Sequence, residues 1–141
     1  MKSLLFLVSL AACVTASHAL AAGSIQSPGI YGSKKLITKL DHETLQASSG
    51  WKIGDGEPPI GPDKAAELAL AAQRKQFPEL TDGAVKEVSL GSSPNGCYYR
   101  VTIFQPVDMK AVAAAGGSTK PNQMNYYILL NSSVIEPEIR D

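Results

Sequence analysis

The sequence has few cysteines, few aromatic residues, no excess of charge and no long apolar stretch. Two cysteines in 141 residues are too few for a disulfide scaffold or a cysteine-rich zinc site. Thirteen basic and 13 acidic residues give a net charge of zero, which excludes a chain built as a whole to bind nucleic acid or an anionic membrane surface. Because no segment after the N-terminus approaches ~18 consecutive apolar residues, we expect no membrane span in the mature chain.

What remains is the composition of one globular domain. Hydrophobic residues make up 44% of the chain and charged residues 18%, which allows a packed core and argues against wholesale disorder. Composition alone therefore bounds the class of protein without indicating what it does.

The N-terminus has the pattern of a secretory signal peptide. Lys2 is the only charged residue before position 34, residues 4–10 are almost purely apolar, and small residues follow. We predict a signal peptide over residues 1–21, cleaved after Ala21 or, as the next choice, after Ala19. This pattern predicts export to a periplasmic or extracellular location.

A competing interpretation concerns Cys13. Residues 10–13 (LAAC) resemble a bacterial lipoprotein box, in which the cysteine is acylated and anchors the protein in the cell envelope. This alternative requires an unusually short signal of 12 residues before Cys13. Cleavage after Ala21 would instead remove Cys13 and leave Cys97 as the only thiol, so that no disulfide within the chain is possible.

The first part of the mature chain gives weak structural signals. Residues 22–33 are rich in Gly, Ser and Pro without periodicity, and we expect a flexible arm. Residues 34–141 are predicted to form a single domain. Alternation over residues 34–40 indicates a further N-terminal strand, which residues 44–47 extend or pair with. Residues 51–60 are expected to be an irregular connection.

The clearest predicted element is a helix over residues 61–77. Pro62 suits the first helical position, and Pro78 ends the helix. Small apolar residues recur at helical spacing and form a narrow stripe: Ala65, Leu68, Ala69 and Ala72. Such a stripe lets the helix lie close against a sheet.

Strand patterns dominate the C-terminal half. Strands are expected over residues 85–90, 97–105, 124–130 and 134–136, with an insertion at 106–123 and a short helix within it over 109–115. In the second strand one face is expected to point into the core: Cys97, Tyr99, Val101 and Ile103. The predicted fold class is therefore α+β, with one main helix packed on an antiparallel meander of three to four strands and the N-terminal strand as an optional addition.

Three short motifs resemble those of small exported bacterial PepSY-like domains. They are residues 62–69 (PDKAAELA), 99–101 (YRV) and 130–134 (LNSSV), and the resemblance covers roughly residues 62–136. It implies a cystatin-like α+β roll that binds or inhibits a partner in the cell envelope. The chain departs from the family in lacking its Asp-x-x-x-Gly final turn and in carrying the insertion.

The order of elements is also similar to that of cystatins. Their inhibitory Gln-x-Val-x-Gly loop is approached only by residues 105–109 (QPVDM), which lack the glycine and follow the second strand after the helix rather than the first. Fold analogy alone does not carry function, so we do not predict protease inhibition of the cystatin type.

Few residues offer chemistry. Cys97 and His42 form the only conceivable thiol–imidazole pair, but Cys97 opens a strand on the expected core face, where a thiol is inert. His42, between Asp41 and Glu43, is the only histidine after cleavage and is expected in a solvated turn rather than a metal site. We therefore predict no catalytic residue, no metal site and no cofactor.

These observations lead to one main hypothesis and two alternatives. The main hypothesis is an exported, non-enzymatic module that binds a protein or peptide partner through the insertion at 106–123, the arm at 22–33 or a sheet edge. The first alternative is a small secreted enzyme that uses Cys97, which requires an accessible thiol. The second is an envelope lipoprotein acylated at Cys13.

Overall fold

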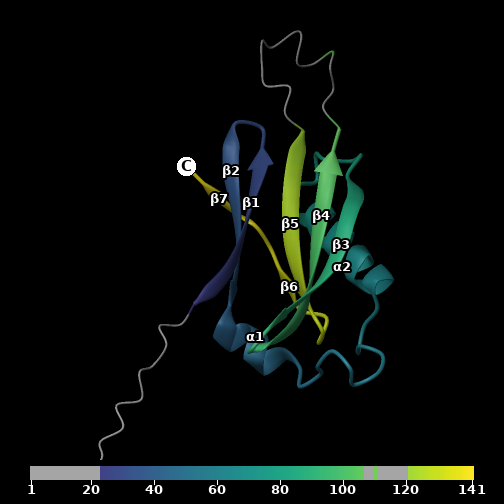
Figure 1. Cartoon of the computed structure of the whole chain (residues 1–141). Helices are drawn as coiled ribbons and strands as arrows, with labels where there is room; N and C mark the ends of the chain where they lie inside the picture. Colours follow the sequence, from purple (N-terminus) through teal and green to yellow (C-terminus); the bar gives the residue numbers. More distant parts are fainter. Residues whose placement is uncertain (1–22, 107–109, 111–120) are drawn as a thin grey trace, which may run out of the picture.

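Seven antiparallel strands form one sheet, accompanied by two helices (Figure 1). The computed structural model describes residues 23–106, Lys110 and residues 121–141. Along the chain the elements are β1 (Ser24–Tyr31), β2 (Lys34–Asp41), α1 (His42–Ser48), α2 (Pro62–Gln76), β3 (Ala84–Ser93), β4 (Gly96–Gln105), β5 (Asn122–Leu129), β6 (Val134–Ile135) and β7 (Glu138–Arg140). The strand order is β3-β4-β5-β1-β2-β7, and β6 pairs with β5 off this path.

The predicted fold class, one main helix on a meander of three to four strands, is wrong. The sheet dominates the molecule because three segments join the meander: the expected arm, the optional strand and the C-terminus supply β1, β2 and β7. The predicted main helix is present as α2. Residues 44–47, which were expected to extend the N-terminal strand or pair with it, belong instead to the shorter helix α1.

The segment 22–33 is not a flexible arm, because Ser24–Tyr31 is a complete strand. It pairs with β2 along its whole length, from Ser24 opposite Asp41 to Tyr31 opposite Lys34, around a two-residue turn. The inward-facing residues of β1 include Ser27 and Gly29, both buried. Because neither is apolar, the strand lacks the hydrophobic alternation by which a half-buried strand is usually predicted.

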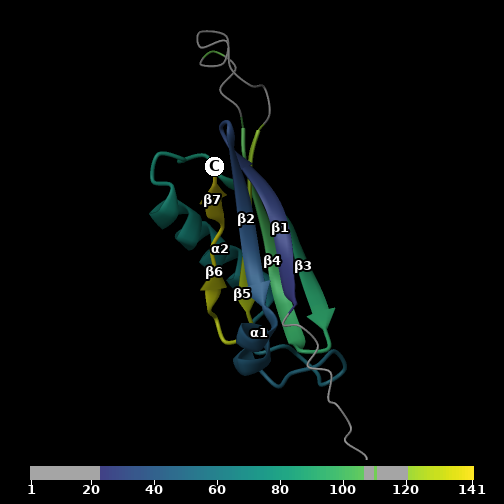
Figure 2. The ribbon, with the colours of Figure 1, turned by 90° about the vertical axis from the view of Figure 1, so that its left-hand side faces the viewer.

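Helix α2 covers one face of β3, β4 and β5 (Figure 2). Ala65 and Ala69 of the small-residue stripe are fully buried, Ala72 nearly so, and Leu68 packs against the same core. The facing side of β4 is the predicted one: Cys97, Tyr99, Val101 and Ile103 are all buried. The prediction of a helix packed on a β surface through this stripe is confirmed, although the sheet is larger than expected.

The opposite face of the sheet is covered as well. The β1–β2 hairpin and α1 lie over it, and a second buried cluster fills the interface: Leu40, Leu45, Tyr127 and Leu129. The Tyr127 hydroxyl is 2.5 Å from the Ser27 hydroxyl across this interface. Burial raises the pKa of Tyr127, an effect that the bond to Ser27 partly offsets. Strand β5 is therefore buried on both faces, and its residues from Met124 to Leu129 are all buried.

Two predicted segments lie largely outside the described residues. These are the signal peptide over 1–21, with the Cys13 alternative, and the insertion at 106–123 with its short helix. Within the described ranges, neither helix has the length and apolar character needed to cross a membrane.

Candidate functional site

The structure does not bring Cys97 and His42 together as a catalytic pair. Cys97 is buried, with 4% of its surface exposed, and its sulfur lies 3.8 Å from the Ser92 hydroxyl. His42 begins α1, with its imidazole ring close to Gly23. No hydrogen bond joins the two side chains in the described part of the chain. Among the described residues, the hydrogen-bond partner of this buried thiol is therefore Ser92, not an imidazole.

A metal site at His42 finds no support in this geometry either. Among the described residues, no group of three His, Cys, Asp or Glu side chains could hold a metal ion.

Three binding surfaces were predicted: the insertion, the arm and the sheet edges. The insertion lies mostly outside the described residues, and the arm at 22–33 is part of the sheet. The two sheet edges, β3 and β7, carry charges: Lys86 lies in a bulge between Val85 and Glu87 of β3, and Arg140 is paired with Glu138 on β7. Charges and bulges of this kind discourage the addition of another strand, so neither edge is the best candidate.

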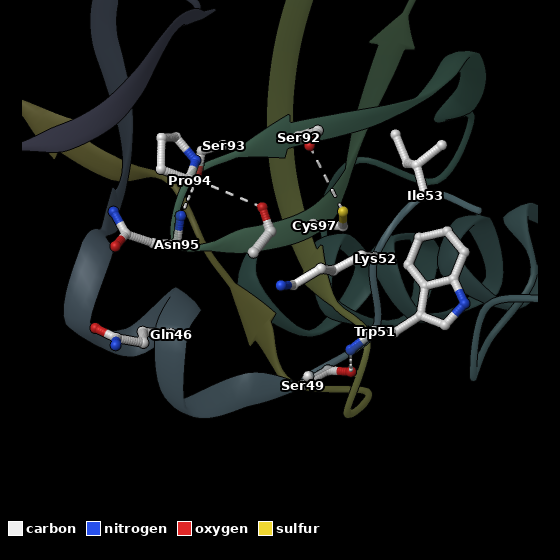
Figure 3. A pocket seen from close by; sticks show the side chains of 12 residues that line it. Gln46, Ser49, Trp51, Lys52, Ile53, Ser92, Ser93, Pro94, Asn95 and Cys97 are labelled. Carbon is white, nitrogen blue, oxygen red and sulfur yellow. Dashed lines mark hydrogen bonds between the residues drawn. The ribbon is translucent and has the colours of Figure 1, made fainter. Parts of the chain in front are cut away.

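A cleft of about 490 Å³ lies beside α1 (Figure 3). Two loops form its walls: residues 49–53, which follow α1, and residues 92–97, which contain the turn between β3 and β4. Gln46 of α1 completes the lining. Its volume falls within the range of ~300–1,000 Å³ that is typical of small-molecule sites.

Both walls are held by their own hydrogen bonds. In the first loop, the Lys52 amide donates to the Asp55 carboxylate (2.9 Å) and the Asp55 amide donates back to the Lys52 carbonyl (3.0 Å). In the second, the Asn95 amide donates to the Ser93 hydroxyl (3.2 Å). Gly96 ends this turn with a φ of 143°, which favours glycine, and lies against Leu45 of α1. The cleft is therefore preformed rather than dependent on a ligand.

The cleft has a polar and an apolar end (Figure 3). The Lys52 side chain lies across it and directs its ammonium group toward the side where Asn95 and Gln46 lie. Trp51 and Ile53 stand at the opposite side. Ile53 has 64% of its surface exposed to solvent, a large fraction for an apolar residue.

Lys52 is the only charged residue in the lining. Its ammonium group has no ion-pair partner among the residues that the structure describes. Asp55 is engaged with the backbone amide of Lys52 and is not part of the lining. The cleft therefore presents one unneutralised positive charge beside an apolar wall.

Two smaller hollows, of about 280 and 200 Å³, lie side by side between β1 and β3, on the face of the sheet that the β1–β2 hairpin covers. Their charged groups are already engaged with protein partners. Arg100 is paired with Glu87 (3.3 Å), and the Lys86 ammonium lies 4.2 Å from the centre of the Phe104 ring. The charged groups of these hollows are therefore less available to a ligand than the Lys52 ammonium in the cleft.

Comparison with protein-family models, curated proteins and solved structures gives no match to this chain. The resemblance to PepSY-like domains therefore stays a prediction, and the candidate site depends on the geometry described above.

The loop at residues 49–53, which forms one wall of this cleft, is not predicted as a binding site from the sequence. Residues 51–60 were expected only as an irregular connection, yet they contain the single tryptophan and the most exposed large apolar side chain described, Ile53. Two large apolar residues in a loop rich in Gly and Pro are a usable signal, because loops on a rigid scaffold often carry binding residues.

Proposed function

We propose that this chain is an exported, non-enzymatic module that binds a protein or peptide partner in the cleft between residues 49–53 and 92–97. The observation that carries the proposal is the preformed cleft itself, which combines exposed Ile53 with an unneutralised Lys52. Cys97 at its edge is buried and bonded to Ser92, which supports a binding role rather than catalysis.

The proposed export depends on the N-terminal pattern and is compatible with the fold. The first strand begins at Ser24, three residues beyond Ala21. Cleavage after Ala21 would therefore remove the signal peptide while leaving all seven strands intact. Acylation at Cys13 would leave the same strands intact and is the competing proposal.

Intact mass of the protein purified from its native cells distinguishes these two routes. We expect a mature chain that begins at Ala22 and carries no lipid, because the residues before it match the small-residue cleavage zone of a signal peptide. A mass that corresponds to a chain beginning at an acylated Cys13 would replace free export with an envelope anchor. A mass that includes Met1 would overturn export by a cleaved signal.

Site-specific photo-crosslinking in the native cells tests the proposed partner. A photoreactive amino acid at Ile53 is expected to give a discrete crosslinked species, because this side chain is exposed beside the cleft. The matched control is Ile139 on β7, an apolar residue that is exposed to 44% away from the cleft lining. Crosslinks of equal yield at both positions, or none at Ile53, would contradict binding at the cleft.

A further inference from the structure

We infer that the cleft selects a carboxylate on an apolar stem, supplied by the C-terminal residue of the peptide or protein partner. The inference rests on the proposed binding role of the cleft and adds the chemistry that the cleft recognises. It follows from the side chains that line the cleft and from the order in which they lie.

The charge in the cleft favours an anion. Lys52 contributes the only charge in the lining, and no carboxylate there competes for its ammonium group. The turn that closes between Lys52 and Asp55 fixes the backbone from which this side chain extends. On the side toward which the ammonium points, Asn95 and Gln46 carry side-chain amides whose N–H groups can donate hydrogen bonds. A carboxylate accepts such bonds and also interacts with a lysine as a point charge.

The opposite wall favours an apolar group on the same ligand. Trp51 and Ile53 flank that side of the cleft, across from Asn95 and Gln46 (Figure 3). The indole is partly buried and packs against the core between α2 and the sheet. The ring nitrogen lies on the side away from Lys52, which leaves the ring itself as the wall. A ligand can therefore interact with both sides of the cleft at once only when it carries an apolar group and a carboxylate.

The single tryptophan makes binding directly measurable. Because Trp51 is the only tryptophan in the chain, its fluorescence reports on the cleft alone. The probes are N-acetylphenylalanine and its C-terminal amide, together with the peptide Gly-Gly-Ala-Phe as the free acid and as the amide. Each pair differs only at the terminal group, which is an anionic carboxylate in one member and a neutral amide in the other.

We expect each acid to bind about two- to fivefold more tightly than its amide at low salt, because an ion pair at an exposed lysine contributes at most about 1 kcal/mol. The preference should shrink at high salt because exposed charges are screened. Lys52→Gln is expected to abolish the preference, whereas Lys34→Gln, which removes the same charge from the first residue of β2, is expected to retain it.

The two probe families also identify the source of the carboxylate. Tighter binding of the peptide acid than of N-acetylphenylalanine is expected for a peptide C-terminus, and equal binding would overturn this source of the carboxylate in favour of a free organic acid. Equal affinities of acid and amide, no fluorescence response to any probe, or a preference that survives in Lys52→Gln would each overturn the inference. Crosslinking at Ile53 without any acid preference would reject this inference and leave the proposed binding function in place.

Discussion

Replacing Gly29 by alanine is expected to destabilise the protein by about 2 kcal/mol, a typical cost of inserting an atom into a well-packed site. An added Cβ would lie 2.5 Å from the carbonyl oxygen of Gln123 and 3.2 Å from the Cβ of Leu36. The first contact is with backbone, which cannot rotate out of the way as a side chain can. Strand β1 would have to move away from β5 at the point where Ile30 pairs with Gln123.

The sign of this effect distinguishes steric contact from backbone entropy. At a site with open space, Gly→Ala normally stabilises a protein by ~0.4–1 kcal/mol, because alanine restricts the unfolded chain. Gly50→Ala is the matched control, since nothing lies within 4 Å of an added Cβ there. Urea unfolding of both variants gives the comparison. A Gly29→Ala variant as stable as the wild type would show that β1 does not approach β5 this closely.

The same contact explains why the sequence did not predict β1. A strand is normally recognised from alternating apolar residues, but β1 presents Ser27 and Gly29 to the interior. Gly29 is small because β5 approaches, and Ser27 is polar because it reaches the Tyr127 hydroxyl. Both choices depend on residues about 100 positions away, which no local pattern contains.

The C-terminal strands were predictable because their signals are local. Strand β4 alternates strongly, and its predicted core face from Cys97 to Ile103 is buried as expected. The helix α2 likewise begins at Pro62 and carries its own apolar stripe. The number of strands was not predictable in this way, because pairing of β2 with β7 joins segments far apart in the chain.

The sequence of β5 contains a local signal for a second layer over the sheet. Residues 124–130 (MNYYILL) are nearly continuous in apolar and aromatic residues rather than alternating, which is typical of a strand buried on both faces. The structure covers one face of β5 with α2 and the other with the β1–β2 hairpin and α1. A single helix could not have covered both faces, so this segment already required a second layer. The cleft residues were harder to identify, because Trp51 and Lys52 become a site only when the β3–β4 turn lies opposite them.

Asn125 of β5 links the β1–β2 hairpin to the rest of the sheet through hydrogen bonds. It is 4% exposed, on the face of β5 that the hairpin covers. Its side-chain amide donates to the carbonyl of Pro28 (2.6 Å), its side-chain oxygen accepts from the Thr102 hydroxyl (2.7 Å), and its backbone carbonyl accepts from Thr38 (2.5 Å). One residue thus joins β1, β2 and β4 to β5, where the backbones of β1 and β5 have separated.

Asn125→Ala is expected to lower the free energy of unfolding by about 3 kcal/mol, because it leaves the Pro28 carbonyl and the Thr102 hydroxyl without their partner and opens a small cavity. Asn131→Ala removes an exposed side-chain bond to the Ser133 amide and is expected to cost about 1 kcal/mol or less. Urea unfolding at pH 7 measures both. A loss for Asn125→Ala no larger than that for Asn131→Ala would show that the network does not hold the hairpin in place.

Asn125→Asp tests the direction of the hydrogen bonds rather than the size of the side chain. At pH 7 a carboxylate at this position still accepts from Thr102, but it faces the Pro28 carbonyl without a proton to donate. Burial would raise the pKa of the new carboxyl group in the folded state above its unfolded value, so the folded state binds more protons as the pH falls. Relative to the wild type at each pH, the variant is therefore expected to be least stable at pH 7 and to recover toward pH 4, where the protonated acid donates to Pro28 as the amide did. A destabilisation that stays constant between these two pH values would contradict donation from position 125 to the Pro28 carbonyl as the contact that holds β1 over β5.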